Sequence, residues 1–101
     1  MDKLLVHTKQ LDGMIDEVLP MLIADDWQQA AEKMPQVIEM LDIFLQFILE
    51  GDPDEELLET TRFLLKRLLF AVQISDSIQL ADILAYEVGN MMQMVYENNP
   101  C

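Results

Sequence analysis

Apolar side chains recur along the whole chain at steps of three and four residues, which is the spacing of one face of an α-helix. No stretch sustains the two-residue alternation of a half-buried strand, and the chain contains only three glycines. The pattern therefore predicts an all-α protein. The first helical segment carries one continuous stripe, formed by Leu4, Thr8, Leu11, Ile15, Val18 and Leu22.

Pro20 falls near the end of this first stripe. Proline removes one helical hydrogen bond and crowds the preceding turn. Because the apolar spacing continues to Leu22, we expect a kinked or tightened last turn. A stop at Leu19 is the alternative.

A second helix is expected to start at Asp25 or Asp26, whose side chain can accept hydrogen bonds from free amides at a helix start. Pro35 either divides this segment near Met34 or bends one continuous helix. Residues 37–49 are apolar on nearly every side, as expected of a helix that is buried on most of its surface.

Two further breaks are visible, at residues 50–54 and 75–77, where glycine, proline, aspartate and serine gather. They bound a third helix from about Pro53 to about Ile74 and a last helix that frays near Asn98. The last helix is expected to bury one face, made of Ile78, Ala81, Leu84, Ala85, Val88, Met92 and Val95.

The elements together predict one helical domain over residues 1–101, without repeats or linkers. Four helices joined by short turns favour an antiparallel, up-and-down bundle with kinks near Pro20 and Pro35.

Charge narrows the possible partners. The 101 residues include 19 acidic and 6 basic side chains, for a net charge of -13, although 51% of the residues are hydrophobic. A surface of this sign repels nucleic acid and anionic lipid. The one cysteine, Cys101, allows no internal disulfide, and charges interrupt the first nine residues before a signal peptide could form. We expect a cytoplasmic protein that does not bind membranes.

Candidate catalytic and metal-binding arrangements all lack an essential part. A di-metal bundle site needs Glu-x-x-His pairs, and the single histidine, His7, has no acidic residue three positions before it. The acidic run from Asp52 has no glycine at its sixth position and has Phe63 at its twelfth, unlike a calcium loop. No spacing joins a nucleophile to an activating base. We expect no enzyme activity, cofactor, metal or small-molecule substrate.

Methionine is the most informative residue type. The chain has eight, and Met91, Met92 and Met94 cluster with Val95 and Tyr96 near the end of the last helix. Flexible methionine side chains adapt to irregular partners. These positions cover more than half of a helical circumference, so they cannot all face one core. A partner surface and plain core packing are equally favoured by the pattern.

The charge distribution adds to this picture, because no basic residue follows Arg67. Glu87 and its acidic neighbours on the last helix would suit a basic amphipathic helix as ligand. The alternative is a solvated acidic face that keeps an apolar domain soluble.

The stretch from Asp76 to Glu87, with its Leu-Ala-Asp-Ile-Leu-Ala-Tyr-Glu run, resembles the last helix of a family of short, all-helical, uncharacterised proteins of Gram-positive bacteria. Residues 34–41 resemble their second helix. The family implies no catalytic residues. In size, acidity and helix count the chain is also similar to flagellar and type III export chaperones. Within the resembling stretch, Asp82 and Tyr86 lie one helical turn apart and are predicted to form a structural polar cluster inside the bundle.

Two functional hypotheses follow. In the first, the chain is a non-catalytic adaptor or chaperone-like module that binds a partner helix through Met91, Met92, Met94, Val95, Tyr96 and Glu87. In the second, the chain is a self-assembling structural homodimer with no separate ligand.

Overall fold

The computed structural model describes residues 3–51 and 54–98, and within these ranges the chain is helical apart from short turns. The all-α prediction is therefore confirmed. The elements are α1 (Lys3–Ile23), α2 (Trp27–Glu50), α3 (Glu55–Gln73), α4 (Ser77–Asp82), a π-helical segment η1 (Ile83–Val88) and α5 (Gly89–Asn98). The predicted start of the third helix at about Pro53 lies outside the described residues, as do residues 99–101.

Both proline positions lie inside continuous helices. Helix α1 runs through Pro20 to Ile23, and α2 runs through Pro35 to Glu50. The alternatives in which a helix stops at Leu19 or near Met34 are therefore wrong. Both prolines are exposed, so each ring lies on the solvent side of its helix and leaves the buried stripe intact.

The turns after α1 and α3 share one hydrogen-bonding pattern. In the first, the amide of Asp26 donates to the Met21 carbonyl at 2.8 Å, and Asp25 has a left-handed φ of 56°. In the second, the amide of Asp76 donates to the Ala71 carbonyl at 2.9 Å, and Ser75 has the same φ of 56°. Each turn is a Schellman motif, which satisfies the last carbonyls of the preceding helix.

The residue after each left-handed position then starts the next helix. A carboxylate oxygen of Asp26 accepts from the Gln29 amide at 3.3 Å, and one of Asp76 accepts from the Gln79 amide at 3.1 Å. Asp54 caps α3 in the same way, accepting from the Leu57 amide at 2.8 Å. Of the two positions predicted for the start of the second helix, Asp25 or Asp26, the structure has Asp26, and the predicted break at residues 75–77 contains Asp76, which caps α4. Aspartate side chains satisfy the free amides at both starts.

The last helix is continuous but not regular. Helix α4 passes into the wider π-helical turns of η1, which lead directly into α5. Of the face predicted for this helix, Ile78 and Ala85 are exposed, whereas Ile83 and Met91 are buried. Ala85 and Ile83 lie within η1, where π-helical turns change the phase of the residues around the axis. Ile78 precedes η1, and its predicted burial is wrong because Ser77 and Leu80 occupy the inward positions of α4.

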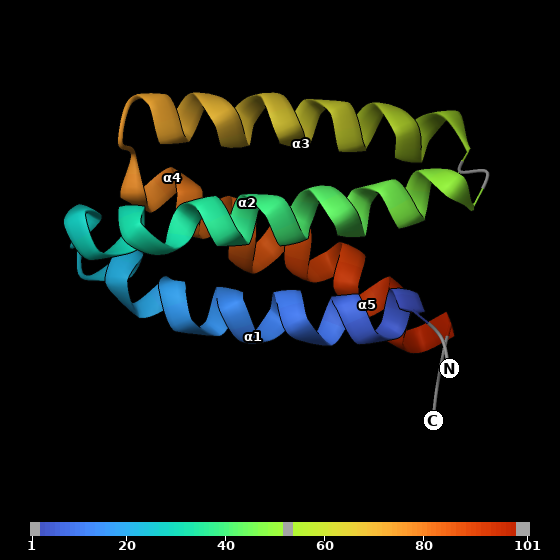
Figure 1. Cartoon of the computed structure of the whole chain (residues 1–101). Coiled ribbons are helices and arrows are strands. Elements are labelled where there is room, and N and C mark those ends of the chain that lie inside the picture. The colour runs from blue at the N-terminus through green and yellow to red at the C-terminus, as the bar shows by residue number, and fades with distance from the viewer. Residues whose placement is uncertain (1–2, 52–53, 99–101) are drawn as a thin grey trace.

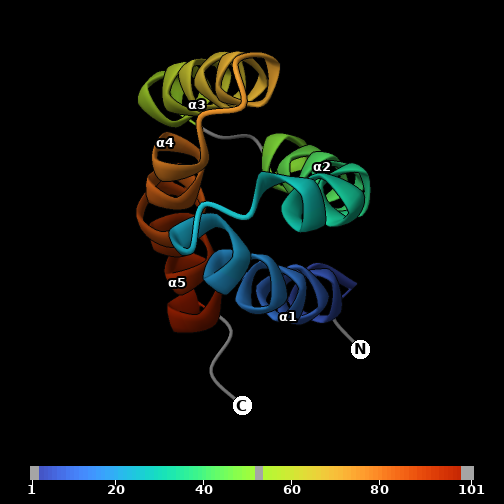
Figure 2. The same cartoon turned by 90° about the vertical axis from the view of Figure 1, so that its left-hand side faces the viewer.

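The helices pack unequally around α1. Helix α1 contacts α2 along much of its length and also touches α4, η1 and α5, whereas α3 packs on α4 and η1 and scarcely approaches α2. Figure 1 shows the turns after α1 and α3 at one end of the molecule, and the end of α2 near the start of α3 at the other. Viewed from the side, the continuous last helix descends from α3 to α1 (Figure 2).

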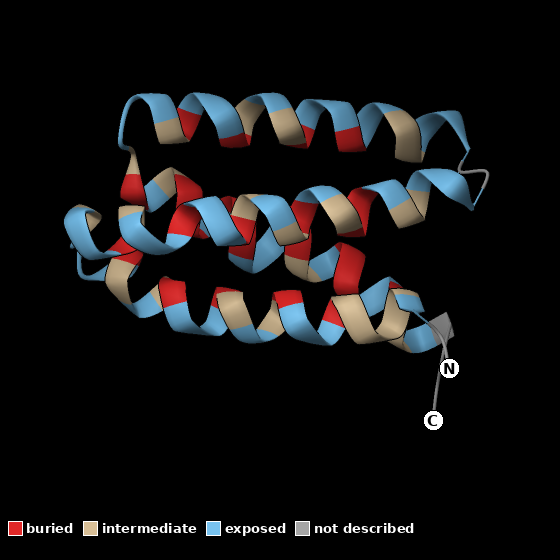
Figure 3. Ribbon diagram, in the orientation of Figure 1, coloured by how far each residue is buried: buried red, intermediate tan, exposed pale blue. Residues whose placement is uncertain are grey.

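The buried residues lie on the sides of the helices that face inward, as Figure 3 shows. On α1 they are Thr8, Leu11, Ile15, Val18 and Leu22, which confirms the predicted stripe from its second member onward. The Thr8 hydroxyl donates to the Leu4 carbonyl at 2.7 Å, and the hydroxyl of buried Thr61 donates to the Leu57 carbonyl at 2.8 Å. These two threonine hydroxyls are therefore satisfied within their own helices.

The left-handed backbone conformation of Ser75 yields a prediction. A side chain in this conformation is strained by about 1 kcal/mol, and glycine is not. We expect Ser75→Gly to raise the free energy of unfolding by about 0.5 kcal/mol, because relief of strain exceeds the entropy that glycine adds to the unfolded chain. Urea unfolding followed by circular dichroism measures the change. The control Gln73→Gly, in the regular last turn of α3, should instead destabilise. A less stable Ser75→Gly protein would contradict the strain argument.

Candidate functional site

An apolar hollow opens where α3 and α5 diverge. It has a volume of about 260 Å³ and lies between the start of α1, the end of α2, the start of α3 and α5. We call it the methionine hollow, and it is lined by Leu4, Phe47, Ile48, Gly51, Leu57, Met91, Met94 and Val95. Because α3 packs on α4 and η1, its first turns separate from α5 and leave this space open.

A second depression, of about 360 Å³, adjoins the methionine hollow and shares Leu57, Met91 and Met94 with it. Its lining also contains the carboxylates of Asp54, Glu56 and Glu87. We call these three carboxylates the acidic rim. An apolar floor bordered by negative charge is therefore a single continuous feature of this end of the molecule.

Glu87 connects the acidic rim to α3. One of its carboxylate oxygens accepts from the Arg67 guanidinium, which also lies 5.6 Å from the centre of the Phe63 ring. The other oxygen, Oε2, is shielded from solvent and has no hydrogen-bond partner among the described residues. Glu87 was predicted as a partner-binding residue, and the structure shows that one of its two carboxylate oxygens is already paired within the chain.

The six predicted partner-binding residues do not form one surface. Met91, Met92 and Val95 are buried within the chain, at 4%, 5% and 6% exposure, and only Met94 is largely exposed, at 47%. Met92 and Tyr96 lie on the side of α5 that borders α1. The prediction of a single surface is wrong because consecutive positions on one helix point to different neighbours.

The hollow also contains residues that the sequence analysis missed. Phe47 and Ile48 come from the end of α2 and Leu57 from the first turns of α3. The available signal was the antiparallel order of the predicted helices, which places the start of the third beside the end of the fourth.

The predicted polar cluster of Asp82 and Tyr86 is wrong. Both side chains are exposed, Tyr86 at 68%. Leu80, Ile83 and Leu84 occupy the inward positions of this stretch, so the two polar residues lie on its outer side.

Tyr96 has the polar contact instead. Its hydroxyl donates to a carboxylate oxygen of Asp12 at 3.3 Å and so ties α5 to α1. Burial, together with the negative charges of Asp12 and Asp16 and the hydrogen bond to Asp12, raises the pKa of Tyr96 above its usual value of 10.0. The folded chain therefore favours the neutral phenol.

His7 lies apart from the hollow's interior, with its ring centre 5.3 Å from that of Phe47. Within residues 3–51 and 54–98, no three His, Cys, Asp or Glu side chains gather closely enough to hold a metal ion. None of the described helices is long and apolar enough to cross a membrane. The hollow thus offers hydrophobic contact and negative charge.

No protein-family model, curated protein or solved structure matches the chain. The methionine hollow is therefore the feature of this chain that indicates a function.

The different exposure of Met92 and Met94 yields a first prediction for this site. We expect Met92→Lys to lower the free energy of unfolding by more than about 2 kcal/mol, because it places a charge in the core. Met94→Lys should change it by less than about 0.5 kcal/mol, because this side chain reaches solvent. Chemical denaturation of both variants measures the difference, and equal stabilities would refute the assignment of Met92 to the core.

Tyr96 yields a second prediction, on pH. Because the folded-state pKa is raised, the contribution of Tyr96 to stability is fully present below pH 10 and is lost as the pH rises through the folded-state pKa. Tyr96→Phe should cost about 1 kcal/mol near neutral pH and should make the decline above pH 10 shallower. Unfolding measured across alkaline pH checks this, with Tyr86→Phe as a control that keeps the wild-type profile. An unchanged slope in Tyr96→Phe would count against it.

Proposed function

We propose that the chain is a non-catalytic protein–protein interaction module, an up-and-down four-helix bundle that holds a helix of another protein in the methionine hollow. The observation that supports this most directly is the hollow's combination of an apolar floor with an acidic rim. An amphipathic helix of a partner protein binds by laying its apolar face in a hydrophobic groove.

The rim defines the expected partner. Asp54 and Glu56 are exposed, whereas Glu87 is partly buried and paired with Arg67, so the first two carboxylates are the ones that a partner can reach. The expected partner is a helix with apolar residues on one face and Lys or Arg on the adjoining face. Its apolar side chains would enter the hollow, and its cations would lie at the rim. The net charge of -13 would also attract such a helix over distance.

Methionine suits this role better than a rigid side chain would. Met94 is exposed at the opening, while Met91 is buried in the wall that it shares with Leu57. Unbranched thioether side chains change rotamer at little cost, so the hollow can accept more than one apolar residue type.

The proposal extends to the wider role and its place in the cell. An adaptor or chaperone-like role agrees with the resemblance to export chaperones in size, acidity and helix count. We propose a cytoplasmic location, which suits a chain whose single cysteine allows no internal disulfide. The alternative homodimer through Met91, Met92 and Val95 is disfavoured because these side chains are buried within one chain.

The test uses two synthetic amphipathic helices that share a leucine face and carry either lysine or glutamate on the polar face. We expect the lysine peptide to bind the wild-type protein in calorimetric titration. Met94→Lys should weaken this binding about tenfold or more, because it adds a cation and removes the apolar contact at the opening.

The matched control is Ile23→Lys, which makes the same charge change at a site that is 74% exposed in the last turn of α1, outside the hollow. This variant should bind like the wild type. Equal binding of the glutamate peptide, or undiminished binding by Met94→Lys, would refute the proposed site. If the lysine peptide binds as expected, a tagged pull-down identifies the natural partner as the protein that Ile23→Lys retains and Met94→Lys loses.

A further inference from the structure

Helix α3 carries apolar side chains on its outer side as well as on its inner side. Its inward face consists of Thr61, Leu64, Leu68 and Ala71. On the outside, Phe63 and Phe70 are 62% and 54% exposed. We call the outward-facing set the outer α3 strip, which consists of Arg62, Phe63, Lys66, Leu69 and Phe70.

The strip has the spacing of a helix contact. Lys66 lies three or four residues from each of the other members, so all five share one side of α3. A surface helix normally presents polar residues outward, and adjoining exposed apolar residues mark an interaction site. Since α3 packs on α4 and η1 and scarcely approaches α2, the described chain leaves the strip uncovered.

The cations of the strip indicate the charge of what covers it. Among the described residues, the ion pairs join Lys33 to Glu17 and Arg67 to Glu87. Arg62 and Lys66 take part in neither. A partner surface with carboxylates would neutralise both, and it would do so beside apolar contacts that exclude water. A chain with a net charge of -13 is an unfavourable partner for nucleic acid, so a protein surface is indicated.

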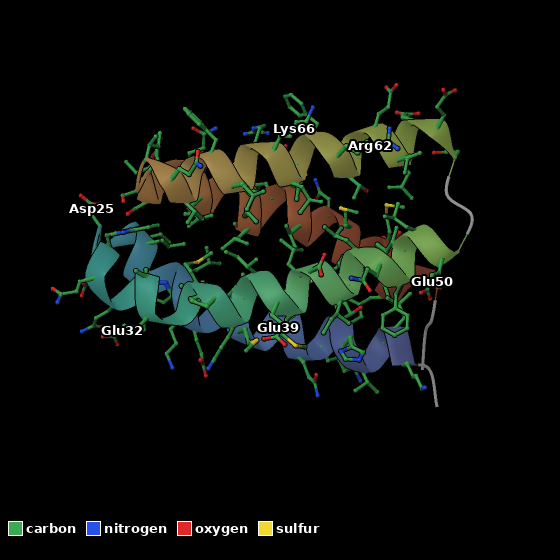
Figure 4. All side chains as sticks on the ribbon, turned by 45° about the horizontal axis from the view of Figure 1, so that its top comes forward. Asp25, Glu32, Glu39, Glu50, Arg62 and Lys66 are labelled. Carbon is green, nitrogen blue, oxygen red and sulfur yellow. The ribbon has the colours of Figure 1, made fainter. Side chains whose placement is uncertain are left out.

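The chain itself presents such a surface on α2. Glu32, Glu39, Asp42 and Glu50 are exposed along this helix and belong to neither ion pair. In Figure 4, Glu32, Glu39 and Glu50 follow α2 while Arg62 and Lys66 lie on the neighbouring α3. The same view places Lys66 nearly level with Glu39 along the length of the molecule.

We propose that a second copy of the chain covers the outer α3 strip, in a symmetric dimer in which α3 of each copy packs on the acidic side of α2 of the other. A two-fold axis running between α2 and α3, parallel to them, brings each helix opposite its complement in the other copy. Lys66 then faces the partner's Glu39, and Arg62 faces the partner's Asp42. Both contacts occur twice.

Direct pairing of two α3 helices is the competing arrangement. In a parallel orientation it places Arg62 and Lys66 of one copy against the same cations of the other, and like charges at close range oppose association. In an antiparallel orientation it turns them toward the exposed Glu55 and Glu59 of the other copy, and Glu39→Lys would leave such a dimer intact. The proposed contacts of Lys66 with Glu39 and of Arg62 with Asp42 use none of the residues that line the methionine hollow, so the inference does not depend on the proposed function.

The experiment measures mass by sedimentation equilibrium for the wild type, Lys66→Glu, Glu39→Lys and an equal mixture of the two variants. We expect the wild type to dimerise, and all samples are compared at one salt concentration, because salt screens both the interface ion pairs and the repulsion between two chains of net charge -13. Each variant alone should dissociate about tenfold or more readily, because each places two like-charged pairs in the interface. The mixture should form a heterodimer. At one contact the introduced glutamate at position 66 faces the introduced lysine at position 39, and at the second contact the original Glu39 faces the original Lys66.

Matched controls carry the same charge changes on exposed positions elsewhere: Lys9→Glu on α1 and Glu97→Lys on α5 should dimerise like the wild type. A monomeric wild type would overturn the proposal and leave the strip to an acidic helix of a different protein. Dimers that survive both single variants, or a mixture that stays monomeric, would overturn the pairing of α3 with α2. Met94→Lys should leave the dimer intact, which separates this result from a failure of the hollow.

Discussion

The apolar stripe of α1 is the surface on which most of the molecule assembles. From Thr8 to Leu22 it is almost fully buried, and α2, α4, η1 and α5 all contact this helix. Burial of apolar side chains is the main favourable contribution to folding, so loss of one side chain from this stripe affects several interfaces together. Only α3 is held indirectly, through the last helix, and its position follows from where that helix lies.

Local chemistry accounts for the parts of the fold that could be predicted. Helical periodicity identified the α1 stripe, and aspartate caps placed the starts of α2 and α4. The π segment could not be predicted, because residues 83–88 have no composition that distinguishes them from an ordinary helix. The continuity of α2 through Pro35 also depends on tertiary packing, since burial of Val37 and Leu41 stabilises the helix on the far side of the proline.

The candidate site was predicted less well, for a geometric reason. Composition drew attention to methionines at the end of the last helix, and Met91 and Met94 do line the hollow. Which methionines face solvent depends on the phase of α5 after the π segment, and the hollow itself depends on the angle between α3 and α5. Neither quantity is encoded in a short stretch of residues. Glu87 was likewise identified from charge, but its contact with Arg67 joins residues on different helices.

The one-sided attachment of α3 has a consequence for local opening. Regions with few buried contacts open at a smaller free-energy cost than the global unfolding of the domain. Helix α3 is therefore the natural sub-globular unit of this protein, and its backbone amides are the ones to exchange hydrogen with solvent well before those of α1. A surface bound over α3 would slow the exchange of its amides and so reduce the difference between the exchange rates of α3 and α1. These rates therefore report on whether α3 is covered.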